Sequence, residues 1–319
     1  MAFRLVTRSD FDGLVCAALF EELGLIDDIL FVHPKDVQDG VVDITDRDIT
    51  TNLPYSAGAH LVFDHHLSET VRVARQPNHI IDPDAPSAAR VVWRYYGGAE
   101  AFSRISEEMM TAVDKADSAQ YDVEEIHDPR GWTLLNFVMD ARTGLGRFRD
   151  FRISNVELMR MLISACRETD VEQILELPDV AKRVALYRAH VTPFQAQLRR
   201  CSRLIGDVVV VDLRHEDTIY VGNRFMIYAL FPQAKVSVHV LWGKQRQNTV
   251  LAVGKSIVDR SSRVNIGELM LGFGGGGHRN AGTCQVDHDM AEHILKVVVA
   301  ALNAAEHAPG DPPTVTVPG

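Results

Sequence analysis

The sequence has few cysteines, no long apolar run and no excess of positive charge. Its four cysteines are scattered and form no Cys-x-x-Cys pair, which argues against a disulfide framework and against a zinc ribbon. No apolar run approaches the ~18 residues that span a bilayer, and the apolar start at residues 3–7 is too short for a secretory signal. We therefore expect a cytoplasmic protein that has no membrane partner.

Acidic residues outnumber basic ones. The chain has 43 aspartates and glutamates against 33 lysines and arginines, which gives a formal net charge of −10. Such a surface repels long polyanions, so we do not expect the protein to bind long duplex DNA. A short anionic substrate that meets a local positive or metal-lined site is compatible with this charge. The length of 319 residues predicts about two domains.

The first half of the chain alternates short apolar segments with helical patterns. We expect strands at residues 3–7, 29–32 and 59–63, and helices at residues 13–23, 87–96 and 103–116. Polar and charged residues directly follow the strands. This order predicts an α/β protein with a doubly wound parallel sheet.

The second half begins with a mainly helical stretch, residues 155–201, in which we expect breaks at Pro178 and Pro193. An α/β block follows, with strands expected at 207–213, 236–242, 250–253 and 283–286 and helices at 225–230, 266–271 and 290–303. The expected domains are a catalytic domain at 1–150, a helical connector at 151–200, a smaller α/β domain at 201–306 and a disordered tail at 307–319.

Two carboxylates, Asp10 and Asp12, stand one residue apart where the first strand turns into a helix. If both point into one crevice, their repulsion is costly unless a cation lies between them, and Mg²⁺ or Mn²⁺ prefers such oxygen ligands. Gly13 allows close approach of the backbone, and the helix start offers free N–H groups to a phosphate. Taken alone, so short a pattern also fits a solvated loop.

Two further polar segments follow directly after apolar segments of the sequence. Asp64-His65-His66 follows an expected strand, where both histidines can turn toward one crevice and Asp64 can orient an imidazole. Asp114 and Asp117 lie at the end of an apolar helix, where acidic side chains oppose the helix dipole and are costly unless used. Surface histidines and a solvated helix end are the plain alternatives.

The fourth segment, residues 272–282, contains four consecutive glycines followed by His278 and Arg279. Ordering so many glycines costs entropy, which a folded domain tolerates best where its backbone comes very close to a ligand. Arg279 is suited to phosphate oxygens. A flexible linker is the alternative, but the run leads directly into an expected strand.

In this order, the four segments resemble the DHH phosphoesterase superfamily with its C-terminal DHH-associated domain, which carries the glycine-rich segment. The resemblance covers nearly the whole chain. It implies a hydrolase that is similar either to exopolyphosphatases or to oligoribonucleases that also act on 3′-phosphoadenosine 5′-phosphate. In such enzymes one or two Mn²⁺ or Mg²⁺ ions activate water for in-line attack on phosphorus. A catalytically weakened nucleotide-binding regulatory protein on the same scaffold is the second hypothesis.

The resemblance also implies roles for individual residues and for partners. Asp117 fits the last metal ligand better than Asp114, because a small hydroxyl residue and then an aromatic one follow it. The substrate would be a short oligonucleotide, a nucleotide or polyphosphate, and a homodimer is compatible with the family. The implied residues are Asp10, Asp12, His65, Asp117 and Asn52 for metal, Asp64 and His66 for catalysis, and Arg8, Gly275, Gly276, Gly277, His278 and Arg279 for substrate.

Two positions depart from the family pattern. Val6 stands where the family commonly has a histidine, and Arg8 lies nearby. The place of the family's bridging aspartate is ambiguous among four residues: Asp43, Asp46, Asp48 and Asn52. If Asn52 holds it, a neutral amide would bridge two cations less well than a carboxylate, so that one ion would bind tightly and a second weakly.

Overall fold

A computed structural model describes residues 2–148 and 150–307 of the chain. By contact, these residues divide into two compact units. The first holds the residues up to 121 together with 128–188, and the second holds 122–127 and the residues from 189 onward. The domain boundaries expected from the sequence stay a prediction, and the expected tail lies outside the described residues except for His307.

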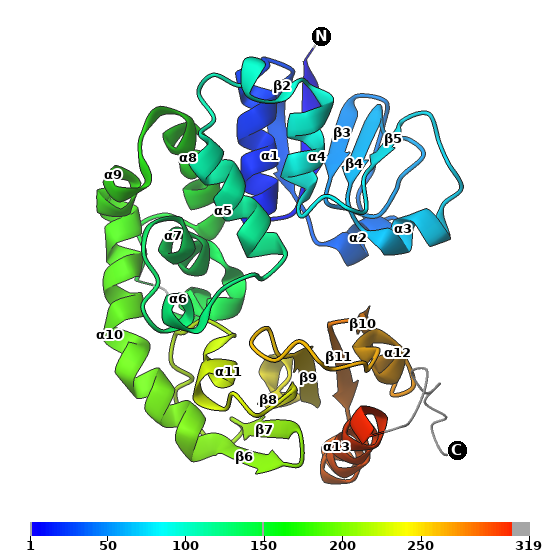
Figure 1. The fold of residues 1–319 in the computed structure, drawn as a ribbon, viewed down its shortest axis with the longest axis vertical. Coiled ribbons are helices and arrows are strands. Elements are labelled where there is room, and N and C mark those ends of the chain that lie inside the picture. Colours follow the sequence, from blue (N-terminus) through cyan, green and yellow to red (C-terminus); the bar gives the residue numbers. More distant parts are fainter. Residues whose placement is uncertain (1, 149, 308–319) are drawn as a thin grey trace. The chain divides into compact units, whose positions relative to one another are not determined.

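The first unit is built on a five-stranded, wholly parallel sheet in the order β2-β1-β3-β4-β5 (Figure 1). Its strands are β1 (Phe3–Thr7), β2 (Ile26–Phe31), β3 (Asp48–Thr51), β4 (Leu61–Asp64) and β5 (His79–Ile81). The strand order reverses between β1 and β3, which makes their carboxyl ends the switch point where α/β sheets commonly bind ligands. The prediction of a doubly wound parallel α/β sheet is confirmed.

The central helix of the first unit is α1 (Phe11–Glu22), which is buried from Phe11 to Phe20 because α4, α5 and α8 pack against it. Eight α-helices are described in this unit: α1, α2 (Pro34–Gln38), α3 (Leu67–Arg72), α4 (Ala88–Tyr95), α5 (Glu107–Asp117), α7 (Gly131–Met139), α8 (Asn155–Glu168) and α9 (Val171–Glu176). Short 3₁₀ turns are η1 (Gly98–Glu100), η2 (Ala141–Thr143) and η3 (Leu145–Arg147).

Helix ends differ from expectation where a capping side chain decides them. Asp10 caps α1 by accepting a hydrogen bond from the Gly13 N–H, so α1 starts two residues earlier than expected and includes Asp12. Ser106 caps α5 in the same way, so this helix starts later than expected.

The expected break at Pro193 is wrong. Helix α10 (Pro178–Cys201) runs through Pro193 as one helix of 24 residues. A proline removes a single N–H donor, and the helical hydrogen bonds on either side keep this long helix continuous. Pro178 does mark a boundary, because it occupies the first helical position, where no N–H partner is needed. Residues of α10 up to Arg188 belong to the first unit and the rest to the second.

The second unit has a six-stranded sheet in the order β10-β11-β9-β8-β7-β6, in which only β7 and β8 are parallel neighbours. Its strands are β6 (Ser202–Ile205), β7 (Val208–Asp212), β8 (Val236–Trp242), β9 (Thr249–Lys255), β10 (Gly276–His278) and β11 (Ala281–Val286). Its helices are α6 (Val123–His127), α11 (Met226–Leu230), α12 (Ile266–Leu271) and α13 (Ala291–His307), with the short turn η4 (Lys244–Arg246). Apolar residues of the sheet, α12 and α13 form one core.

Helix α6 joins the second unit although the segments before and after it belong to the first. It packs against α11, and the buried Asn223 donates a hydrogen bond from Nδ2 to the carbonyl oxygen of Ile126 at 2.9 Å. The five residues of α6 therefore belong to the second unit, although in the sequence they lie between α5 and α7 of the first.

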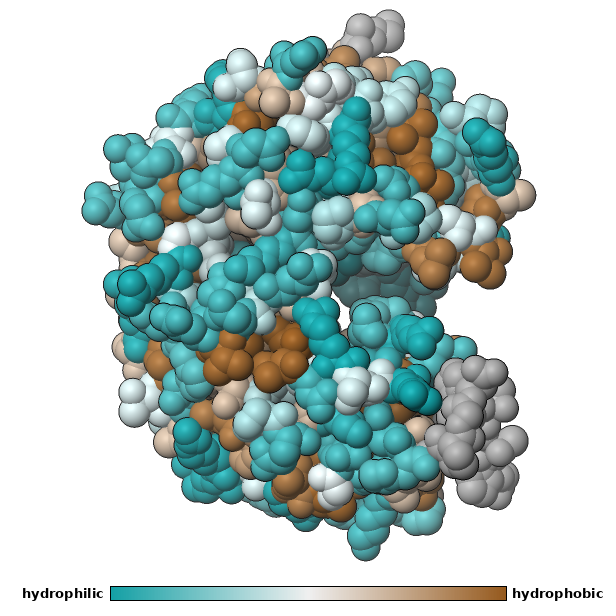
Figure 2. Space-filling model, viewed as in Figure 1, coloured by the Kyte–Doolittle hydropathy of each residue, from teal (hydrophilic) through white to brown (hydrophobic). Residues whose placement is uncertain are grey.

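Hydrophilic residues cover most of the face seen in Figure 2. Large apolar side chains are nevertheless exposed at some positions, among them Leu67 and Val71 on α3. Among the helices in the described part of the chain, none is long and apolar enough to cross a membrane.

Candidate metal and phosphate site

The carboxyl ends of β1, β3 and β4 bring several polar residues to one edge of the first sheet. Asp10 and Asp12 follow β1, Asn52 follows β3, and Asp64 ends β4 just before His65. The two central strands are tied together at this edge, because the Thr51 hydroxyl donates a hydrogen bond to the Thr7 hydroxyl at 2.7 Å. The switch point of the sheet therefore positions these side chains.

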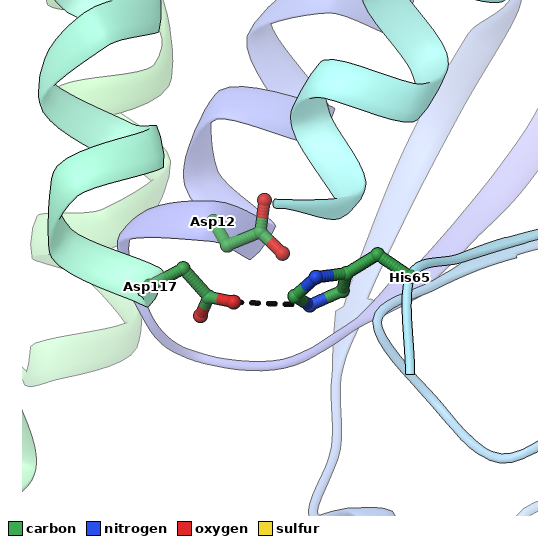
Figure 3. A group of neighbouring side chains, drawn as sticks. All are labelled: Asp12, His65 and Asp117. Carbon is green, nitrogen blue, oxygen red and sulfur yellow. Dashed lines mark ion pairs between the residues drawn. The ribbon is translucent and has the colours of Figure 1, made fainter. Parts of the chain in front are cut away.

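Asp12, His65 and Asp117 converge from three separate elements (Figure 3). One ligand atom from each lies within 4.8 Å of the others, so the three residues could hold a metal ion. Nε2 of His65 lies 3.0 Å from Oδ2 of Asp117, yet it has no well-aligned hydrogen bond to any described residue. The two atoms are therefore close enough to share a proton or to bind one cation.

Nearby backbone groups orient two of these side chains. Nδ1 of His65 lies 3.2 Å from the carbonyl oxygen of Ala85, which favours a proton on Nδ1 and leaves Nε2 for a metal. Both carboxylate oxygens of Asp12 accept hydrogen bonds from the start of α4, from the N–H groups of Ala88 at 3.1 Å and Ala89 at 2.8 Å. Asp12 is thus held in place by hydrogen bonds to both of its oxygens, and it is only 2% exposed.

Electrostatics at this group favour a bound cation. Burial raises the pKa of Asp12, and the charge of Asp117 adds to the rise. Burial alone would lower the pKa of His65, but Asp117 and Asp12 raise it to about 9. Burial would raise the pKa of Asp117, yet His65 keeps it below its usual value. Protons held by Asp12 and His65 would offset part of the negative charge of the three side chains. A divalent ion would offset more of this charge.

Asp114, the other acidic candidate on α5, lies outside the three-residue group. Its carboxylate accepts hydrogen bonds from the Ser87 hydroxyl at 2.7 Å and from Nε of Arg90 at 2.8 Å. Ser87 is itself the N-cap of α4. Asp114 therefore fixes the start of α4, which in turn holds Asp12.

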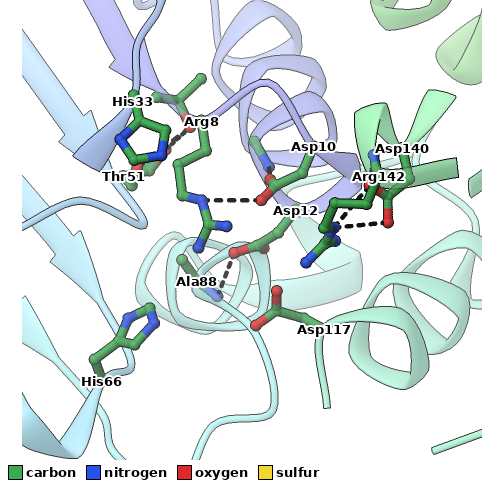
Figure 4. A network of polar contacts seen from close by, with 12 residues as sticks. Arg8, Asp10, Asp12, His33, Thr51, His66, Ala88, Asp117, Asp140 and Arg142 are labelled. Carbon is green, nitrogen blue, oxygen red and sulfur yellow. Dashed lines mark hydrogen bonds and ion pairs between the residues drawn. The ribbon is translucent and has the colours of Figure 1, made fainter. Parts of the chain in front are cut away.

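Asp10 stands beside the group and is paired differently (Figure 4). One of its oxygens accepts the capping hydrogen bond from Gly13, and the other lies 3.1 Å from Nε of Arg8. Burial raises the pKa of Asp10, and the charge of Arg8 opposes this rise. A Cβ atom on Gly13 would lie 2.0 Å from the carbonyl oxygen of Arg8. Gly13 is therefore required by the close approach of its own loop.

Asn52 occupies the carboxyl end of β3 with a left-handed φ of 55°. It is 1% exposed, and neither Oδ1 nor Nδ2 has a hydrogen-bond partner among the described residues. Each buried polar group left unsatisfied costs about 1–3 kcal/mol, so this amide is poised for a ligand. Asp43 and Asp46 precede β3 and Asp48 opens it, which puts all three at the opposite end of the strand.

Asp64 and His66 form a pair at the end of β4. Asp64 is fully buried, and its Oδ1 lies 2.7 Å from Nδ1 of His66. The His66 side chain is 43% exposed, and its ring lies 4.6 Å from the His65 ring, measured between centroids. Asp64 therefore orients His66 rather than His65.

In the second unit, the glycine-rich segment forms the hairpin of β10 and β11. A Cβ on Gly275 would lie 2.1 Å from the Thr283 carbonyl oxygen, and one on Gly277 would lie 2.3 Å from that of Ala281. These two glycines are explained by packing within the hairpin, whereas Gly276 faces open space.

The exposed residues His278 and Arg279 lie at the turn of this hairpin. Burial lowers the pKa of Lys255, and the charge of Arg279 lowers it further. The Lys255 N–H donates a hydrogen bond to the carbonyl oxygen of Asn280 at 2.9 Å, so Lys255 lies beside the turn that carries Arg279. Sequence reasoning missed Lys255, because its place at the end of β9 follows from the sheet pairing alone.

Sequence reasoning also missed Arg142, which η2 brings toward Asp10 and Asp117. It lies in a stretch that carries no recognisable motif, after a largely buried helix. The only local signal is the Asp140-x-Arg142 spacing, in which Asp140 caps the turn that carries the arginine.

No protein-family model and no curated protein sequence matches the chain. Among solved structures, the chain is similar to the pGpG-specific phosphodiesterase PggH from Vibrio cholerae, with 59% sequence identity, a TM-score of 0.83 and coverage of 95% of this chain and 99% of that one. It also resembles an exopolyphosphatase-related protein from Bacteroides fragilis, with 11% identity, a TM-score of 0.53 and coverage of 96% and 94%. The second likeness concerns the fold alone.

Proposed function

Because the chain belongs to the DHH superfamily of phosphoesterases, and is thus a hydrolase acting on phosphorus–oxygen bonds, we propose that its substrate is a short linear dinucleotide such as pGpG. Hydrolysis of the single phosphodiester of pGpG would release two molecules of 5′-GMP. The observation that carries this proposal is the convergence of Asp12, His65 and Asp117 in a chain 59% identical to a pGpG-specific phosphodiesterase.

The metal in this proposal is Mn²⁺ or Mg²⁺, held by Asp12, His65 and Asp117. Two carboxylates and one imidazole suit Mn²⁺ well, and Mg²⁺ would rely more on the oxygen ligands. Asp10 and Asn52 follow β1 and β3 at the same edge of the sheet and would hold a second, weaker ion, since an amide is a poorer ligand than a carboxylate. When bound, the metal lowers the pKa of water and offsets charge on the phosphoryl oxygens.

His66 is the proposed proton donor to the departing oxygen. The buried Asp64 accepts from Nδ1 of His66 and so fixes the orientation of the ring, which leaves Nε2 as the ring nitrogen that can face a substrate. A histidine held in this way can give a proton to the alkoxide that leaves when the phosphodiester breaks. Asp64 acts here as a positioning residue.

Each unit offers its own candidate groups for a phosphate or nucleotide. In the first unit Arg8 offers a positive charge beside Asp10. In the second unit the candidate residues are Gly275, Gly276, Gly277, His278 and Arg279. The open space at Gly276 and the exposed charge of Arg279 support this role. An acidic surface with local positive charge suits a substrate of two nucleotides better than a long strand.

The experiment is a substrate panel with purified protein in Mn²⁺, in Mg²⁺ or in EDTA. The panel holds pGpG, other dinucleotides, cyclic dinucleotides, 3′-phosphoadenosine 5′-phosphate, pyrophosphate and polyphosphate. We expect turnover of pGpG that requires metal and falls roughly 10³-fold in Asp12→Ala, because a catalytic metal contributes several kcal/mol. Asp128→Ala removes an exposed carboxylate that pairs with Arg130 two residues away and is the matched control.

Two results would contradict this proposal in different ways. Turnover of another member of the panel in place of pGpG would refute the substrate. Binding of nucleotide without turnover of any member would favour the nucleotide-binding regulatory protein.

A further inference from the structure

Arg142 is held in a fixed orientation by a residue outside the candidate metal site. Asp140 caps the turn η2 and accepts a hydrogen bond from the Arg142 N–H at 2.8 Å. Its two carboxylate oxygens also accept from Nε of Arg142, at 2.7 and 3.0 Å. One edge of the guanidinium is thereby engaged and its direction is set.

The other end of the same guanidinium is available for a ligand. Neither Nη atom of Arg142 makes a hydrogen bond to another residue within 2–148 and 150–307, and half of the side chain is exposed. Partial burial lowers the pKa of Arg142, while the carboxylates of Asp140, Asp10 and Asp117 raise it. The guanidinium therefore lies within electrostatic reach of two acidic residues of the site without pairing with them.

Arg8 provides a contrast on the other side of the same carboxylates. Arg8 pairs directly with Asp10 through Nε, whereas Arg142 is tied to Asp140 (Figure 4). Two guanidinium groups thus flank one acidic cluster, and a cation held by that cluster would offset the negative charge that faces the Nη groups of Arg142. A phosphate group that arrives with the metal restores the balance, and guanidinium geometry matches two phosphate oxygens.

From this arrangement we infer that Arg142 is a catalytic residue that binds the non-bridging oxygens of the phosphate being cleaved. The inference rests on the proposed phosphodiesterase function. Charge on these oxygens must be stabilised during phosphoryl transfer, and a donor already oriented before the reaction does so without reorganisation. Asp140 supplies the orientation and is a positioning residue.

The test compares Arg142→Gln and Arg142→Lys with wild type and with Arg130→Gln. Arg130 pairs with Asp128 at the same two-residue spacing but is 83% exposed, which makes it a matched control. We expect Arg142→Gln to lower kcat on pGpG about 10²-fold and to raise KM by about tenfold or less. Arg142→Lys should recover part of the rate, because lysine keeps the charge without the fork geometry. Arg130→Gln should behave as wild type.

Two binding measurements make the test independent of turnover. Calorimetry with inorganic phosphate on the Mn²⁺-loaded protein should show binding about tenfold weaker in Arg142→Gln, since hydrogen bonds to charged groups contribute roughly 1.5–3 kcal/mol. The affinity for Mn²⁺ alone should stay the same or rise, because a neighbouring positive charge is removed.

The outcomes separate this inference from the proposed function. A wild type that binds phosphate through Arg142 but does not cleave pGpG would refute the function and support the inference. Wild-type phosphate affinity in Arg142→Gln would overturn the inference. So would a rise in KM at unchanged kcat, which would move Arg142 to a non-reacting phosphate, or a loss of Mn²⁺ affinity, which would make it a support of the metal ligands.

Discussion

The buried polar residues at the two ends of β3 differ in their hydrogen bonding. Asp48 and Asn52 are both 1% exposed. Asp48 accepts hydrogen bonds from Nε and Nη2 of Arg4 and from the backbone and hydroxyl of Thr45, whereas Asn52 has no partner for either side-chain atom among the described residues. The satisfied end contributes to stability, and the unsatisfied end is available for a ligand. Burial alone therefore does not separate structural from functional polar residues.

The largest effect that tests this comparison is on the rate of catalysis at the carboxyl end of the sheet. His66→Ala should lower kcat about 10²-fold, the usual contribution of a positioned proton donor. Its effect on thermal stability should be small, because the side chain is 43% exposed. Steady-state kinetics and thermal denaturation of the same preparation give both values. A large fall in Tm with unchanged kcat would instead give His66, at the carboxyl end, a structural role.

A matched pair of substitutions on β3 should change stability in opposite directions. Asp48→Asn removes the buried charge that pairs with Arg4 and should lower the free energy of unfolding by about 1–3 kcal/mol with little change in kcat. Asn52→Gly removes two unsatisfied atoms at a φ of 55°, which glycine adopts readily. We expect it to raise the Tm of the metal-free protein and to lower activity. Equal destabilisation by both substitutions would remove the distinction between the ends.

The smallest expected effect is a pH dependence of opposite sign at the two ends. Burial raises the pKa of Asp48, but Arg4 and Thr45 lower it overall, so its contribution to stability is lost only as the pH falls through this lowered value. His65 has its pKa raised to about 9 from 6.5, so its contribution is present below 6.5 and lost as the pH rises through about 9.

The measurement is the Tm in EDTA between about pH 2.5 and pH 9.5, compared with the Tm in Mn²⁺, so that the acid limb reports on Asp48 and the alkaline limb on His65. A cation that takes the place of the His65 proton should remove the alkaline loss of stability. A profile in EDTA that stays flat above about pH 6.5 would contradict the charge coupling of His65 to Asp12 and Asp117.

Much of the first unit could be predicted because its strands are short apolar runs that end at charged residues. The parallel sheet, β1 with its exact bounds and the placing of Asp10, Asp12 and His65 at strand ends all follow from that pattern. Helix starts were less predictable, since the capping hydrogen bonds of Asp10 and Ser106 outweigh apolar periodicity. The continuity of α10 through Pro193 depends on the length of helix on both sides.

The candidate site was predicted only in part, because several of its properties depend on three-dimensional pairing. No sequence pattern shows that both side-chain atoms of Asn52 are unsatisfied, or that Asp114 is engaged by Ser87. Arg142 comes from a 3₁₀ turn, and only the folded chain brings it within electrostatic reach of Asp10. The hairpin packing of Gly275 and Gly277 likewise appears only once β10 and β11 are paired.

The membership of α6 in the second unit has a consequence for how the chain can be divided. The polypeptide passes from one unit to the other three times, after residues 121, 127 and 188. A single cut in the chain therefore cannot yield both units whole. A fragment that ends at residue 188 keeps α6 but loses α11 and Asn223, which cover it. Separate expression of the two units would need a circular rearrangement or a graft of α6, rather than a simple truncation.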